Sequence, residues 1–102
     1  MKTILNWKIR WLDDKSGCWY YAKVPILNWE YVIDVGGRYD YENGEFIEYF
    51  EYEPGIFYSK IDDDCSPITK KECYKKLDSA KNACEKHLSD TAEKFNKWIN
   101  KK

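Results

Sequence analysis

The chain of 102 residues has one histidine, one methionine and two arginines, and it lacks the short motifs that mark most enzyme families. No Ser or Cys stands in a nucleophile-elbow sequence, and no two cysteines form a Cys-x-x-Cys pair. Carboxylates are abundant, but without a metal-ligand spacing they identify no reaction. We therefore expect a protein that is not an enzyme and that uses no cofactor.

Zinc ligands are too few for a typical structural site. Cys84 and His87 form a single tight pair, whereas structural zinc sites usually show two such pairs. The other cysteines, Cys18, Cys65 and Cys73, are widely and irregularly spaced. We expect no bound metal and mostly free thiols. A disulfide between Cys65 and Cys73 is the alternative under oxidising conditions.

Long apolar runs are missing as well. Residues 1–8 contain no apolar stretch of the ~7 to 15 residues that a signal peptide needs. No later stretch approaches the ~20 apolar residues that span a bilayer. We expect a cytoplasmic protein without membrane association, and a reducing compartment agrees with free thiols.

Aromatic side chains, in contrast, are plentiful. They make up 18% of the chain, beside 43% hydrophobic and 34% charged residues in total, which is a globular composition with unusually many rings. A chain of this length has room for one domain and one core. Some rings must then be exposed, and the candidates are Trp19, Tyr21, Tyr39, Tyr41 and Tyr49.

The first 61 residues carry the alternation of apolar and polar residues that is typical of strands. Gly36-Gly37 ends the third run, Asn43-Gly44 predicts a two-residue hairpin turn, and Pro54-Gly55 predicts a turn before the last strand. The expected strands cover residues 5–11, 18–24, 29–35, 46–52 and 56–61.

Beyond residue 61 the composition shifts to Lys, Ala and Glu, and apolar residues recur at helical spacing over residues 77–100. Ala80 and Cys84 are small enough to let this helix lie close to an aromatic sheet, while Phe95 and Trp98 are expected to anchor its far end. The sequence therefore predicts one α+β domain over residues 1–102. It consists of a twisted antiparallel sheet of four to six strands within residues 1–61, packed against the helix.

Charge is divided unevenly along the chain. Residues 1–66 hold 7 Lys/Arg and 13 Asp/Glu, net −6, whereas residues 67–102 hold 10 Lys and 5 Asp/Glu, net +5. A pI near 5.8 is too low for a typical phosphate-binding protein, so we expect no direct nucleic-acid binding and interpret the helix lysines as a solvated face.

The acidic residues are densest from Asp34 to Asp64, where ten carboxylates accompany Arg38 and Lys60. Alternate strand residues lie roughly 6.6 to 7 Å apart, a spacing close to that of backbone phosphates. With Phe46, Phe50 and Tyr52 buried, the opposite face could mimic DNA or attract a basic partner; the alternative is an ordinary solvated face. The candidate partner-binding residues are Asp40, Glu42, Glu45, Glu48, Tyr49, Glu51, Glu53, Asp62, Asp63 and Asp64.

Four segments form a recognisable pattern: Leu5-Asn6-Trp7, Trp19-Tyr20-Tyr21-Ala22, Tyr31-Val32-Ile33 and residues 77–87. Together they resemble a family of small phage and prophage proteins that have a Trp/Ala strand, a Tyr-x-Ile strand and a terminal helix with an L-x-x-A-K-x-x-A/C-x-x-H motif. Lys76 departs from the family's helix-capping Ser or Thr, and the acidic segment 39–53 is longer than usual.

The resemblance implies a role in the cytoplasm of a host cell. Small phage proteins of this type include inhibitors of bacterial immunity such as anti-CRISPR proteins, some of which mimic DNA. The partner implied is a host protein or nucleoprotein complex that handles nucleic acid, bound by a monomer or a homodimer. The alternative is a phage accessory or structural domain that acts by association with itself or with a virion protein.

Overall fold

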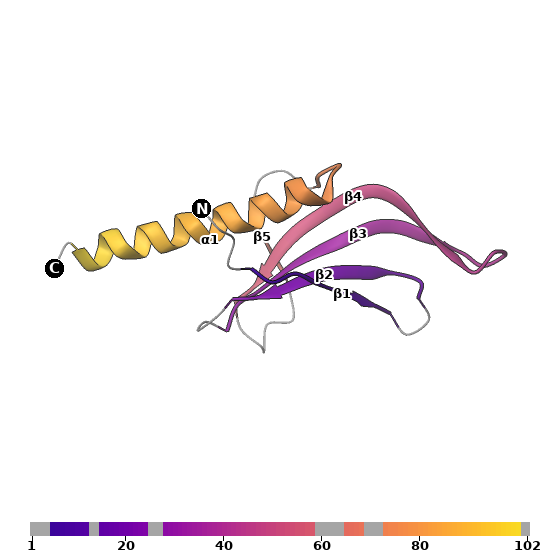
Figure 1. The fold of residues 1–102 in the computed structure, drawn as a ribbon, viewed down its shortest axis with the longest axis horizontal. Coiled ribbons are helices and arrows are strands. Elements are labelled where there is room, and N and C mark those ends of the chain that lie inside the picture. The colour runs from indigo at the N-terminus through magenta and orange to yellow at the C-terminus, as the bar shows by residue number, and fades with distance from the viewer. Residues whose placement is uncertain (1–4, 13–14, 25–27, 59–64, 69–72, 101–102) are drawn as a thin grey trace.

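The computed structural model describes residues 5–12, 15–24, 28–58, 65–68 and 73–100. The strands in these ranges form one antiparallel sheet in which each strand pairs with the next along the chain, and the helix lies across one face of the sheet (Figure 1). The predicted α+β fold is confirmed. The elements are β1 (Lys8–Trp11), β2 (Cys18–Lys23), β3 (Glu30–Asp40), β4 (Glu45–Phe57), β5 (Ser66–Pro67) and α1 (Leu77–Asn100).

The core lies between α1 and the central strands. Tyr31 and Ile33 of β3 point to the helix side of the sheet, and Ile56 of β4 stands directly opposite Tyr31. All three are fully buried, as are Ala80 and Cys84 of α1. Small side chains on the helix let its backbone approach the sheet closely, so the larger Tyr31 and the two isoleucines fill the space between the layers.

A hydrogen bond fixes the middle of α1 to β3. The Tyr31 hydroxyl lies 2.7 Å from His87 Nδ1, and the two rings meet edge to face at 5.7 Å. Burial raises the pKa of Tyr31 and lowers the pKa of His87, so both side chains are neutral at pH 7. The hydroxyl can then donate to the unprotonated ring nitrogen.

Strand β3 continues through Gly36-Gly37, and β4 continues through Pro54-Gly55, where the sequence predicts a break and a turn. The N–H of Tyr52 points away from β3 and donates to the Tyr74 carbonyl oxygen at 2.8 Å. The nitrogen of Pro54, two residues on, points to the same side, so its missing N–H removes no hydrogen bond between β3 and β4.

Gly55 is needed for the approach of the next segment. A Cβ atom on Gly55 would lie 2.2 Å from Cys65 Sγ and 3.2 Å from the Ser66 carbonyl oxygen. Strand β5 pairs at this point, with Ser66 opposite Ile56 and Pro67 opposite Gly55. Pro54-Gly55 is therefore a site of close backbone packing inside a strand rather than a turn.

The far half of α1 extends beyond the sheet, which corrects the expectation that Phe95 and Trp98 anchor it. Their side chains are 58% and 57% exposed, and Figure 1 shows this part of the helix past the strand ends. A 24-residue helix is about 36 Å long, whereas a six-residue strand such as β2 measures about 20 Å. The molecule is accordingly elongated, with dimensions of 62 × 27 × 24 Å.

We expect Tyr31→Phe to lower the free energy of unfolding by about 1 kcal/mol, because it removes the hydroxyl that pairs with His87 and leaves the ring in place. Urea denaturation followed by tryptophan fluorescence measures the change. Tyr39→Phe is the control, since Tyr39 lies away from the core. Equal effects of the two substitutions would contradict the role of this hydrogen bond.

The pH dependence of stability provides a second test of the same contact. Burial lowers the pKa of His87 in the folded chain; Asp90 raises that pKa and Lys94 lowers it by smaller amounts. The unfolded chain therefore binds the proton first as pH falls below about 6.5. We expect the free energy of unfolding to be highest above that pH and to decline toward pH 5. His87→Gln should flatten this decline, and an unchanged slope in that variant contradicts the assignment.

Candidate functional site

The most prominent surface feature is a hairpin formed by residues 36–50, here called the arm. Strand β2 pairs with β3 only as far as Asp34, so the described part of β3 beyond Val35 has β4 as its only paired neighbour. The arm is thus a two-stranded ribbon that projects from the sheet at the end opposite the far half of α1 (Figure 1).

An irregularity in strand pairing lies at the base of the arm. Val35 stands opposite Tyr52 and Gly37 opposite Glu48, so one residue of β3 faces three of β4. Phe50 lies in this bulge with a φ of 56°, which is rare for a residue other than glycine. The bulge turns Tyr49 and Phe50 outward, where they are 48% and 63% exposed. The prediction that Phe50 is buried is therefore wrong, because it assumes unbroken alternation.

Phe46 attaches the arm to the rest of the sheet. Its ring lies across Gly37, where a Cβ atom would come within 2.4 Å of Phe46 Cζ and 2.5 Å of the Ile47 carbonyl oxygen. The same ring meets Trp11 of β1 edge to face at 5.8 Å. Glycine at position 37 makes room for the ring, which in turn covers a part of the strand that has no side chain of its own.

Asp40 shapes the tip of the arm. Its carboxylate accepts hydrogen bonds from the backbone N–H groups of Glu42 and Asn43 at 3.0 and 3.4 Å and from Asn43 Nδ2 at 2.7 Å. The Asn43 hydrogen bond lowers the pKa of Asp40. The loop comprises residues 41–44, with Gly44 at a φ of 66°. Asn43-Gly44 therefore marks the turn correctly, but the loop has four residues because Asp40 holds a wider turn.

Two tyrosines stack at the tip. The rings of Tyr39 and Tyr41 lie 4.9 Å apart with 17° between their planes. Tyr41 is 87% exposed, whereas Tyr39 is half-buried. Of the other rings expected to be exposed, Tyr49 is exposed, and Trp19 and Tyr21 are half-buried on the face of the sheet away from α1.

The predicted acidic residues do not share one face. Glu48 lies on the helix side and accepts a hydrogen bond from the Tyr52 hydroxyl at 3.2 Å. Glu45 and Glu53 lie on the opposite side, where Glu53 stands directly across from Asp34. Glu51 is half-buried and forms an exposed ion pair with Lys75 at 4.0 Å. Asp62, Asp63 and Asp64 lie outside the described residues.

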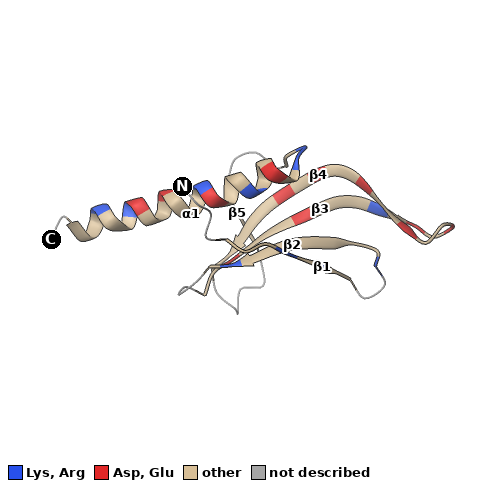
Figure 2. Ribbon diagram, viewed as in Figure 1, with Lys and Arg blue, Asp and Glu red and all other residues tan. Residues whose placement is uncertain are grey.

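The arm does bring four of the predicted residues together at one end of the molecule, namely Asp40, Glu42, Glu45 and Glu48, with Tyr49 at its base. With Arg38 as the sole cation of residues 36–50, this segment has a net charge of −3. Figure 2 shows these acidic residues around the hairpin and a mixture of both charges along α1. The carboxylates surround the arm instead of forming a flat acidic surface.

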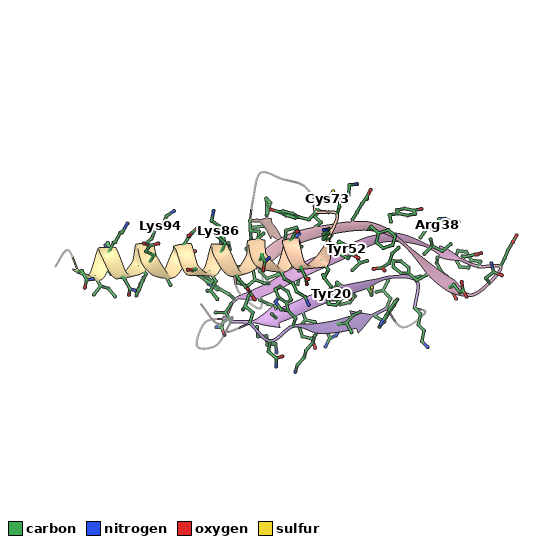
Figure 3. The ribbon with its side chains drawn as sticks, turned by 45° about the horizontal axis from the view of Figure 1, so that its top comes forward. Tyr20, Arg38, Tyr52, Cys73, Lys86 and Lys94 are labelled. Carbon is green, nitrogen blue, oxygen red and sulfur yellow. The ribbon has the colours of Figure 1, made fainter. Side chains whose placement is uncertain are left out.

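Three thiols, those of Cys18, Cys65 and Cys84, are in surroundings that keep them protonated. Burial raises the pKa of Cys84 to about 12 and that of Cys65 to about 11. Burial and then the Glu48 carboxylate raise the pKa values of Cys18 and Tyr52; Tyr52 lies with Tyr20 beneath the start of α1 (Figure 3). A protonated thiol is a poor nucleophile, so these groups offer no activated cysteine.

A metal site is not formed in the described part of the chain, where no group of three or more His, Cys, Asp or Glu is arranged to hold an ion. Cys84 is fully buried, and His87 Nδ1 is already bonded to Tyr31. Within the same described ranges, α1 is too polar to cross a membrane.

Comparison with known proteins finds no matching family model, no similar curated protein and no similar solved structure.

Sequence reasoning missed two contacts that define the arm: the capping of its loop by Asp40 and the bond between Glu48 and Tyr52. The first has a local signal, since an Asp that precedes Asn-Gly within a few residues is typical of side-chain-capped turns. The second has none, because Glu48 and Tyr52 would lie on one face in any regular strand but come within bonding distance only across the bulge.

We expect Asp40→Ala to loosen the tip of the arm without unfolding the domain, because it removes three hydrogen bonds from the loop. Hydrogen exchange followed by NMR should show severalfold faster exchange of the Asn43 and Gly44 amides and unchanged exchange in β2 and α1. Glu42→Ala removes a carboxylate from the same loop and leaves the Asp40 contacts in place. Equal exchange in both variants would contradict the capping role.

Proposed function

We propose that this protein is a small, non-enzymatic phage or mobile-element protein that acts in the host cytoplasm. It binds and inhibits a host defence complex that handles nucleic acid, as anti-CRISPR proteins do, and the arm enters a basic groove on that complex. The observation that carries the proposal is the arm itself, a projecting ribbon with four carboxylates and one guanidinium.

The position of the charges supports insertion of the arm. Its carboxylates surround a ribbon that extends away from the sheet, so a groove can meet them from several sides. Lys86 and Lys94 of α1 point away from the sheet (Figure 3), whereas Lys81 lies over the Tyr20 ring of β2. An acidic end and a mixed-charge helix give the molecule a preferred direction of approach to a basic surface, which raises association rates.

Aromatic side chains supply the short-range contacts that charge alone does not provide. Tyr41 lies at the tip, and Tyr49 and Phe50 lie at the base, all exposed. Tyrosine is enriched among interface residues that contribute most of the binding energy, because it buries a large area at low entropic cost. A protein-binding element is expected to combine both features: carboxylates that attract the partner and aromatic rings that stabilise the complex.

A pair of matched charge reversals tests this proposal. The arm variant Glu42→Lys/Glu45→Lys changes the charge by +4 at two exposed residues whose carboxylates form no hydrogen bond shown above. The control Asp90→Lys/Glu93→Lys makes the same change on α1. The partner is first captured from host lysate with the unmodified protein and identified by mass spectrometry, and the dissociation constant of each variant is then measured by interferometry.

We expect the arm variant to weaken binding at least tenfold and the control to change it less than threefold. Binding should also weaken as salt rises from 50 to 300 mM, because exposed charges are screened within about 8 Å at physiological ionic strength. Equal effects of the two variants, or an arm variant that binds like the unmodified protein, would overturn the proposal.

A further inference from the structure

We propose that two copies of this chain form a symmetric dimer in which the far half of α1 from each copy covers β1 of the other. Residues 89–100 are here called the helix tail. Each chain has a length of helix that extends past its own sheet and a part of the same sheet face that its own helix leaves open. The apolar stripe of the helix tail is suited to cover the open apolar part of the sheet.

The apolar stripe of α1 continues past the end of the sheet. The face that buries Ala80 and Cys84 carries on into the helix tail as Phe95 and Trp98, and Ile99 lies beside them. Phe95, Trp98 and Ile99 are 58%, 57% and 46% exposed. The charged residues of the tail fall on its other sides, so the stripe has the composition of a core-facing helix surface; they are Asp90, Glu93, Lys94 and Lys97.

The matching sheet surface lies on β1. Ile9 stands opposite Tyr20, and Trp11 stands opposite Cys18. Because opposite residues share a face, Ile9 and Trp11 point to the helix side of the sheet. The backbone of α1 lies against β3 and β4, and Ile9 and Trp11 remain 45% and 44% exposed.

The size of these two surfaces suits a dimer. The exposed parts of the three tail residues and the two β1 residues amount to on the order of 500 Å² per chain, since a large aromatic side chain can bury about 150–250 Å². Two such contacts bury on the order of 1,000 Å², the lower bound for a specific interface. A single tail–sheet contact buries only half of this area, so the symmetric exchange of two contacts gives the more stable dimer.

The length of the helix tail and the residues along its side also agree with this dimer. The 12 tail residues measure about 18 Å, enough to cover the roughly 13 Å of the four-residue β1. Lys81 Nζ lies 5.5 Å from the Tyr20 ring centre, which identifies the side of α1 that faces β2. Ile99 follows Lys81 by 18 residues, or five full turns, and shares that side with the uncharged Ala92 and Asn96. Antiparallel helices can therefore lie side by side over the two sheets.

Such a dimer places the two arms at opposite ends, because each arm lies at the end of its chain away from the tail (Figure 1). The assembly would present two acidic arms for two binding sites on one target or on two targets. The dimer does not depend on the function proposed for the arm, and its test can fail or succeed independently.

Sedimentation equilibrium of the full chain provides the test. We expect a mass twice the 12.3 kDa of the chain at micromolar concentration. The tail variant Phe95→Glu/Trp98→Glu and the sheet variant Ile9→Glu should each raise the dissociation constant at least tenfold. Lys97→Glu, which changes charge on the back of the same tail, should leave the dissociation constant within twofold. Circular dichroism spectra should stay unchanged, because all these residues lie outside the buried core.

A mixing experiment decides between this dimer and one formed by two tails alone. A tail variant still has an intact sheet surface, and a sheet variant still has an intact tail, so a mixed dimer retains one of the two contacts. We expect an equimolar mixture to dimerise more strongly than either variant alone. An unmodified chain that is monomeric at 100 µM overturns the proposal, and so does a sheet variant that dimerises like the unmodified chain.

Discussion

The packing of α1 on Tyr31, Ile33 and Ile56 is the contact on which the remaining structure depends. Ala80 and Cys84 let the helix approach, and the bond between His87 and Tyr31 sets where along the sheet it lies. These residues are among the few that are fully buried, so this small region holds the strongest part of the core. Loss of the contact would leave an open sheet with one apolar face in water and a helix too polar to be stable alone.

Because the core is confined to the region where α1 crosses the central strands, the arm and the far half of α1 both lie outside it. At one end of the molecule the helix extends beyond the strands, and at the other end β3 and β4 extend beyond β2. Both extensions expose aromatic side chains, and each has a different charge pattern. The acidic arm carries the charge that the proposed basic partner requires, and the uncharged stripe of the helix tail supplies the apolar surface that the proposed dimer requires.

The helix could be predicted because its signal is periodic over more than six turns, and the order of the strands follows from short connections between alternating runs. The errors arise where a local signal has two meanings. Gly36-Gly37 and Pro54-Gly55 indicate breaks, yet both occur inside strands where another segment packs closely. Phe50 is misplaced by a bulge, and Phe95 and Trp98 are misplaced because periodicity reveals the apolar face of a helix but not where its sheet ends.

The bulge that hides Phe50 from sequence-based prediction also separates the arm from the core. In a regular ribbon, a substitution at residues 45–50 would pass its strain along β4 to Tyr52 and Ile56. Here the bulge at Tyr49, Phe50 and Glu51 interrupts the pairing before the core begins, while Phe46 holds the arm to Trp11 on the near side. Charge changes at Glu42 and Glu45 are therefore separated from the buried residues by an interruption in the ladder. We expect substitutions at these two residues to cost the fold little stability, whereas Glu48 is bonded to Tyr52 across the bulge.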